Sequence, residues 1–146
     1  MYQFSLQHRV RVYVFQVGEI GPRFLLLRQK PAAEWPFGPV VGSVGVGDHL
    51  QDTILREVRE ETGIEKPLHV IDLRQPSKEL FGDVGLVEWP FAYQAGAPHH
   101  AVPKVVPGPR IGEFLWLDFE RAFEHIESKL DRDNLVRLHL RLQQAG

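Results

Sequence analysis

Cysteine is absent from the 146-residue chain. Its absence excludes disulfide bonds, thiol nucleophiles and cysteine-based zinc or iron–sulfur sites, and it fits a reducing compartment. A basic surplus is also absent, because 17 Lys and Arg residues face 19 Asp and Glu residues. Proteins whose main task is to grip nucleic acid usually carry such a surplus. We therefore expect no nucleic-acid partner.

Long hydrophobic runs are missing as well. The N-terminal stretch alternates apolar with polar and basic residues, unlike a signal peptide, and no apolar run approaches membrane-spanning length. We therefore expect a cytoplasmic protein without a membrane partner. Hydrophobic residues make up 43% and charged residues 25% of the chain, which is ordinary for a globular domain. The length predicts one domain over residues 1–146.

The hydrophobic pattern predicts alternating strands and helices. Residues 9–14 alternate as a strand does, and the apolar run at 24–28 predicts a second strand that completes a hairpin. The segment 77–80 is expected to form at most a turn or a cap. Further strands are predicted at 68–73, 84–93 and 114–117, and helices at 50–62, 118–125 and 131–142. This order is typical of an α/β layered domain.

The clearest predicted helix covers residues 50–62. Gly63 is expected to end it, and Asp48 is placed to cap its start by accepting from free backbone amides. A Gly-rich segment precedes the helix, and such a loop lets backbone groups approach a polyphosphate or its metal ion closely. The apolar side of the helix comprises Ile54, Leu55, Val58 and Thr62.

Three carboxylates share another face of this helix, because Glu57, Glu60 and Glu61 stand at positions i, i+3 and i+4. Each like-charge pair costs roughly a few tenths of a kcal/mol in an isolated helix. A solvated, salt-bridged face is the usual meaning of such a charge run. The Gly-rich loop before it favours a metal site instead, because Mg²⁺ and Mn²⁺ prefer oxygen ligands and leave positions open for phosphate oxygens.

The segment Gly42–Ile64, GSVGVGDHLQDTILREVREETGI, resembles the Nudix (MutT-like) hydrolase box. Eight of the nine fixed positions of that box match, and Asp48 stands where the box has Glu. The resemblance implies a Nudix-type α/β/α sandwich with a mixed sheet. It also implies a hydrolase dependent on Mg²⁺ or Mn²⁺ that cleaves a diphosphate linkage in a nucleoside-diphosphate-X substrate. Within the family, the chain looks nearest to dATP pyrophosphohydrolase and dihydroneopterin triphosphate pyrophosphatase proteins.

The resemblance assigns roles to residues of the box. Glu57, Glu60 and Glu61 would bind Mg²⁺ or Mn²⁺, and a main-chain carbonyl near Gly42 would complete the metal shell. Glu57, Glu60 and Arg56 are also candidate catalytic residues. Arg56 would pair with one carboxylate and fix the helix against the loop.

A second departure from the family lies outside the box. Many relatives place a Glu, as metal ligand or base, at the position that Arg110 occupies here. The nearest acid is Glu113. The general base is therefore open among Glu60, Glu113 and a histidine of the Pro-rich loop 95–110, which contains His99 and His100.

Substrate contacts are expected from residues before the box. Arg28 and Lys30 follow the second strand and are candidates to contact phosphate, with ordinary surface charge as an equal alternative. Phe37 is the preferred residue to stack on a base or pterin ring, because it borders the box. The other aromatic candidates are Trp35, Phe81 and Tyr93. The expected partner is a small nucleotide or related pyrophosphate, and a homodimer is among the expected assemblies.

Two alternatives compete with an active hydrolase. The first is a Nudix-fold module that binds nucleotides but has lost efficient hydrolysis, which Asp48 and Arg110 motivate. The second is a structural domain with an incidental acidic helix, which would bind no divalent metal ion.

Overall fold

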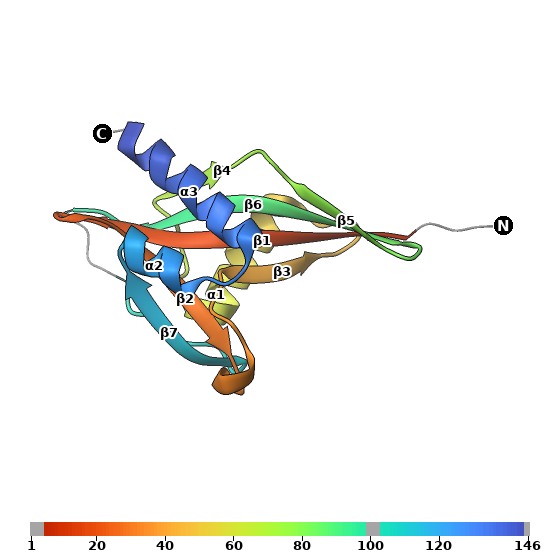
Figure 1. Cartoon of the computed structure of the whole chain (residues 1–146), viewed down its shortest axis with the longest axis horizontal. Helices are drawn as coiled ribbons and strands as arrows, with labels where there is room; N and C mark the ends of the chain where they lie inside the picture. Colours follow the sequence, from red (N-terminus) through yellow and green to blue (C-terminus); the bar gives the residue numbers. More distant parts are fainter. Residues whose placement is uncertain (1–4, 99–102, 145–146) are drawn as a thin grey trace.

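The computed structural model describes residues 5–98 and 103–144. The chain folds into a mixed seven-stranded sheet with helices on both faces (Figure 1). This arrangement confirms the predicted α/β/α sandwich with a mixed sheet. The strands are β1 (Ser5–Gly18), β2 (Gly21–Gln29), β3 (Val40–Val44), β4 (His69–Asp72), β5 (Ser77–Phe81), β6 (Val84–Gly96) and β7 (Ile111–Leu117).

The helices are α1 (Leu50–Thr62), α2 (Phe119–His125) and α3 (Lys129–Gln144), and a short 3-10 turn, η1, covers Ala32–Glu34. Alternation along β1 explains the two layers. Val10, Val12 and Val14 join Ile54 and Val58 of α1 in one buried cluster. Tyr13 and Phe15 point to the other face, where α2 and α3 cover them. The two helical layers are thus held by opposite faces of one strand.

The strand β1 is the centre of the sheet and changes partner along its length. One edge pairs parallel with β6 from Ser5 to Gln16, while its other edge pairs antiparallel with β2 through Phe15–Gly18 and with β3 through His8–Val12. Because one edge serves two strands, β2 and β3 diverge from each other (Figure 1). The β2 strand then pairs with β7.

The predicted helices and the first hairpin are present, while several boundaries differ. The prediction for residues 77–80 is wrong, because they belong to β5, which pairs antiparallel with β6. This strand is short and largely exposed at the edge of the sheet, so its sequence lacks the alternation that burial on one face imposes. The Pro-rich segment forms no helix or strand over the described residues 97–98 and 103–110.

The expected N-cap is also wrong. His49 is the N-cap residue of α1, with no hydrogen bond from its side chain to the helix. The Asp48 carboxylate instead accepts a hydrogen bond from the Gly45 backbone N–H at 2.9 Å, so it stabilises the loop that precedes the helix. The other end of α1 is as predicted, because Gly63 adopts a left-handed conformation with φ of 76° and donates its N–H to the Arg59 carbonyl.

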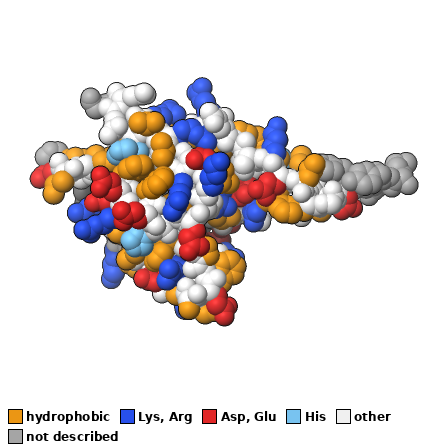
Figure 2. Space-filling model, viewed as in Figure 1, with side chains coloured by type: hydrophobic (Ala, Val, Ile, Leu, Met, Phe, Trp, Pro, Cys, Tyr) orange, Lys and Arg blue, Asp and Glu red, His pale blue; other side chains and the backbone are white. Residues whose placement is uncertain are grey.

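Within the described ranges, no helix combines the length and the apolar character needed to cross a membrane. Acidic and basic side chains are interspersed over the face that carries α2 and α3 (Figure 2). This mixture agrees with the small formal net charge of −2.

Candidate active site

The acidic face of α1 is turned partly inward. Glu57 is 8% and Glu61 is 7% exposed, whereas Glu60 lies on the exposed side of the helix. The helix is fixed below them by the buried side chains of Ile54 and Val58. Two carboxylates are thus held at the protein interior, with a third beside them in solvent.

Burial and neighbouring charges perturb the Glu57 carboxyl group. Burial raises the pKa of Glu57, and the neighbouring charges of Glu60 and then Glu61 raise it further, against the opposing effect of Arg56 and Arg110. At this position the ionised form of the Glu57 carboxyl group is therefore less stable than it would be in water. A bound cation would relieve this cost, which is the property expected of a metal ligand.

Gly42 makes room for Glu57. A side chain at this position would overlap the Cγ and Cδ atoms of Glu57. Gly42 lies in β3, which pairs with β1 and packs beside α1. Because only glycine leaves this space open, the backbone of β3 comes close to the Glu57 side chain.

We expect Gly42→Ala to lower the free energy of unfolding by about 1–3 kcal/mol, because the added methyl group overpacks the contact with Glu57. The displaced carboxylate should also reduce metal-dependent turnover. Urea unfolding and steady-state kinetics measure the two effects. Gly18→Ala is the control, because its Cβ would lie 3.7 Å from its nearest contact, the Gly21 carbonyl oxygen. Equal losses in the two variants would contradict the prediction.

Arginine side chains face the two buried carboxylates. Arg56 lies 3.7 Å from Glu57 and 3.8 Å from Asp48, so its guanidinium stands between the helix and the preceding loop. The Arg110 guanidinium donates to Glu61 at 2.6 Å. This bond with Glu61 raises the pKa of Arg110.

The contact between Arg110 and Glu61 was not predicted. The sequence marks Arg110 as a departure from the family, but the two residues are 49 positions apart. The signal that could have found it is a charge reversal, since a base replaces an expected acid beside a cluster of acids. The Arg110 side chain is 67% exposed. If its guanidinium leaves Glu61, water can therefore solvate the positive charge.

The donor set fits a divalent cation by its chemistry, since carboxylate oxygens suit Mg²⁺ and Mn²⁺. In the parts of the chain that the structure describes, however, no three Asp, Glu or His side chains come close enough together to hold one metal ion. Glu61 bonds to Arg110, and Glu60 points outward. Use of all three carboxylates by one ion would require Glu61 to exchange its arginine partner.

Arg28, Glu113 and Phe37 form a separate cluster. Arg28 lies opposite Glu113 in the β2–β7 pair, with 3.4 Å between Nη1 and Oε2. Its guanidinium also lies 4.1 Å from the centre of the Phe37 ring. Phe37 is 6% exposed and packs in the cluster beneath α2 and α3. Alternation along β2 and β7 therefore turns Arg28 and Glu113 towards the face opposite α1.

Lys30 lies at the end of β2, with an exposed side chain. Its backbone N–H donates to the Arg110 carbonyl at 2.8 Å, which fixes the β2 end beside Arg110. The other sequence candidates for the base, His99 and His100, lie outside the described residues. His125 and His139 pack against aromatic rings, His125 with Phe37 and His139 with Phe119.

A cavity of about 270 Å³ lies beside β1 where β2 and β3 diverge from each other. Among the sequence candidates it is lined by Trp35, Phe37 and Glu61, together with Arg110. Its lining also includes Arg11 and Asp131, which form a buried ion pair at 2.7 Å. Arg28, Lys30 and Glu113 are not part of this lining as far as the structure describes it. The cavity thus brings one α1 carboxylate next to an arginine and two aromatic rings.

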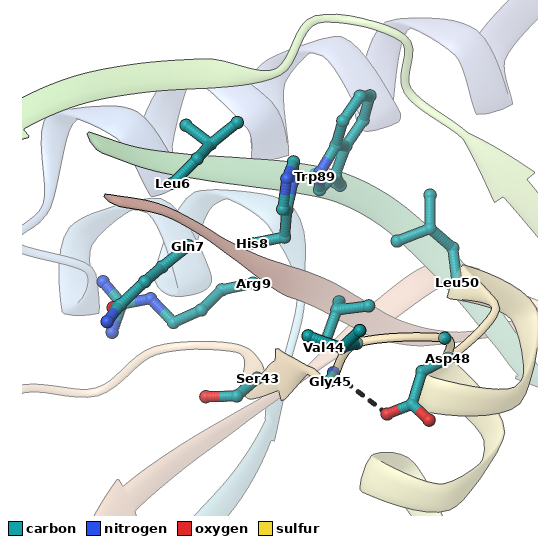
Figure 3. Close-up of a pocket in the computed structure, with 12 residues that line it drawn as sticks. Leu6, Gln7, His8, Arg9, Ser43, Val44, Gly45, Asp48, Leu50 and Trp89 are labelled. Carbon is teal, nitrogen blue, oxygen red and sulfur yellow. Dashed lines mark hydrogen bonds between the residues drawn. The ribbon is translucent and has the colours of Figure 1, made fainter. Parts of the chain in front are cut away.

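A larger cavity of about 650 Å³ lies at the start of β1. Leu6, His8 and Trp89 line one wall, and Asp48 lies on the opposite side near the start of α1 (Figure 3). The His8 and Trp89 rings stack, and Trp89 Nε1 donates to His8 Nδ1 at 3.1 Å. This cavity contains none of the three α1 carboxylates in its described lining. The larger of the two cavities is therefore not the one next to the acidic face of α1.

Residues 7–138 match a family model described as the NUDIX domain. A search of curated protein sequences finds no significant match. Because the family match covers most of the chain, it extends well beyond the box and includes the strands around the 270 Å³ cavity.

Solved structures with the same fold include three similar examples. A putative NUDIX hydrolase from Listeria monocytogenes has a TM-score of 0.78 at 19% identity, covering 94% of this chain and 95% of that chain. The E. coli dihydroneopterin triphosphate pyrophosphohydrolase has a TM-score of 0.74 at 22% identity, covering 92% and 95%. A C. elegans Ap4A hydrolase in a binary complex has a TM-score of 0.73 at 15% identity, covering 94% and 98%.

At these identities the similar structures establish the fold. The family match, in turn, supports hydrolysis of a pyrophosphate bond in a nucleotide-type substrate, and hydrolases of this family generally use divalent metal ions. The chain therefore belongs to the NUDIX domain family, as a pyrophosphohydrolase of that family.

Proposed function

We propose that the protein hydrolyses a diphosphate linkage in a nucleoside-diphosphate-X substrate with Mg²⁺ or Mn²⁺. A deoxynucleoside triphosphate or dihydroneopterin triphosphate that releases pyrophosphate is the preferred form. The observation that carries the proposal is the inward pair Glu57 and Glu61 with Glu60 beside them on one turn of α1. The E. coli structure similar to this chain is named for dihydroneopterin triphosphate, which supports the same substrate class.

In this proposal Glu57, Glu60 and Glu61 hold the metal ion, together with a main-chain carbonyl near Gly42. When bound, the ion neutralises phosphate charge and lowers the pKa of the attacking water. Glu60 is the preferred proton acceptor, because its carboxylate is exposed on the acidic face. Glu113 is less favoured, because it faces Arg28 across β2 and β7.

Arginines supply the remaining functions. Arg56 holds the helix against the loop through Glu57 and Asp48. Arg110 lines the cavity and has an exposed guanidinium, so it is suited to bind a phosphate oxygen once it leaves Glu61. Arg28 and Lys30 stay candidates for phosphate contacts at the end of β2, although neither lines the described part of the cavity.

A substrate panel tests the proposal. Deoxynucleoside triphosphates, nucleotide sugars, dinucleoside polyphosphates and dihydroneopterin triphosphate are each incubated with Mg²⁺, Mn²⁺ or EDTA. Phosphate and pyrophosphate release is then measured. We expect turnover of at least one compound with Mg²⁺ or Mn²⁺ and none with EDTA. Turnover that is equal in EDTA would contradict the metal-dependent mechanism.

The second candidate is a nucleotide-binding module without efficient hydrolysis. The Arg110–Glu61 bond at 2.6 Å favours it, because a guanidinium at that carboxylate competes with a metal ion. This candidate predicts tight nucleotide binding by calorimetry together with no product from any compound of the panel. The hydrolase predicts both binding and product.

A further inference from the structure

Exposure separates the aromatic residues that could stack on a substrate ring. Tyr93 is fully buried and Phe37 is 6% exposed, whereas Trp35 is 45% and Phe81 is 59% exposed. Phe81 ends β5 at the edge of the sheet and is not part of the described lining of the 270 Å³ cavity. Trp35 lines that cavity together with Glu61 and Arg110. It is thus both accessible and next to the acidic face of α1.

The segment that carries Trp35 is hydrogen-bonded to the residue before β7, Arg110. Trp35 closes the η1 turn, with its N–H directed to the Ala32 carbonyl at 3.4 Å. The same segment begins at Lys30, whose N–H donates to the Arg110 carbonyl. A side chain at Gly112 would lie 3.2 Å from Lys30 Cγ, which shows how closely β7 approaches. The backbone of the segment that carries Trp35 is therefore anchored beside Arg110.

Phe37 and Trp35 differ in what already covers their rings. Arg28 lies over the Phe37 ring at 4.1 Å, and His125 meets it edge-on with 5.8 Å between ring centres. For Trp35, no stacking ring or overlying cation is found among residues 5–98 and 103–144. A half-exposed indole at a cavity wall offers a large flat surface to a ligand.

We propose that Trp35, in place of the predicted Phe37, stacks on the planar heteroaromatic ring of the substrate. The ring is a nucleobase or a pterin, and the polyphosphate lies towards Glu61 and Arg110. This inference rests on the proposed function, because it assigns the ring-binding side of the same cavity. Stacking on an indole tolerates different rings, since every base has a π-face. Trp35 therefore recognises a ring without selecting one base.

Kinetics with ring-bearing and ringless substrates test the assignment. Trp35→Leu is expected to raise KM for dATP and dihydroneopterin triphosphate about tenfold with little change in kcat, as the loss of one stacking contact would. KM for inorganic tripolyphosphate should stay unchanged, and Trp35→Phe should restore most of the affinity. Phe81→Leu is the matched control, because it removes an exposed aromatic ring outside the cavity. An equal rise of KM for ringless tripolyphosphate would overturn the assignment.

A binding experiment separates this inference from the proposed function. The three tryptophans give three indole N–H signals in an NMR spectrum, and Trp35→Phe identifies the signal of Trp35. Without metal ions, dATP should shift that signal and tripolyphosphate should leave it in place. If dATP leaves it in place, the inference fails even when hydrolysis is observed. If dATP shifts it but no compound is hydrolysed, the proposed hydrolysis fails and the ring site stands.

Discussion

Glu57→Gln and Glu60→Gln are each expected to lower kcat by at least about 100-fold, because each removes one charged oxygen ligand at the point where phosphate charge must be stabilised. The fold should survive both changes. Glutamine matches glutamate in size, and Glu57 is a buried carboxylate whose pKa is raised by burial and by Glu60 and Glu61. Its removal therefore relieves an electrostatic cost in the metal-free protein.

The measurement combines activity, metal binding and stability. Turnover of the best compound from the substrate panel is followed at saturating Mn²⁺, and Mn²⁺ affinity is measured by electron paramagnetic resonance. Thermal unfolding without metal should show Glu57→Gln at least as stable as the parent. Asp52→Asn is the control, because Asp52 is an exposed acid in the first turn of the same helix. Near-parental rates in both glutamine variants would rule out a metal-binding role for this helix.

Asp131→Ala should give the largest loss of stability, about 3 kcal/mol, because it removes one of the two carboxylates that pair with the part-buried Arg11 and also removes the acceptor of the Tyr13 hydroxyl. Asp131 is 2% exposed. It accepts from Arg11 Nε at 2.9 Å and Nη2 at 2.7 Å, and from the Tyr13 hydroxyl at 2.7 Å. Burial opposes the charge on Arg11, but the hydrogen bonds and charge of Asp131, and then the hydrogen bond to Glu88, outweigh it and raise the pKa of Arg11.

Urea unfolding at neutral pH measures this effect. Asp133→Ala is the matched control, because Asp133 is exposed on the same helix and should change the free energy of unfolding by no more than about 0.5 kcal/mol. A loss below about 1 kcal/mol for Asp131→Ala would contradict the prediction and show that Glu88 and water suffice to hold the Arg11 charge. Because Arg11 and Asp131 also line the 270 Å³ cavity, the variant should weaken substrate binding as well.

The local features of the fold could be predicted from the sequence. The helix at 50–62 combines an apolar side, a terminal glycine and a motif within 23 residues, so all the information lies inside one segment. The β1–β2 hairpin is local in the same sense. The β5 strand is an exposed edge strand, where no buried face imposes alternation, and pattern alone therefore missed it.

Contacts between residues far apart in the chain could not be predicted from the sequence. Arg110 meets Glu61 across 49 positions, and Arg11 meets Asp131 across 120. The sequence around each of these residues carries no signal that identifies its partner. Phe37 illustrates the same limit, because its place beside the box suggested a ligand contact, whereas its burial depends on α2 and α3 at the far end of the chain.

The change of partner along β1 has a mechanical consequence. Because β2 leads to Trp35, β3 carries Gly42, and both strands are hydrogen-bonded to one edge of β1, a shift of β1 would displace the proposed ring-binding residue and the backbone beside Glu57 together. Substrate preference is therefore expected to be tunable through individual side chains, while movements of the central backbone would disturb selectivity and rate at once.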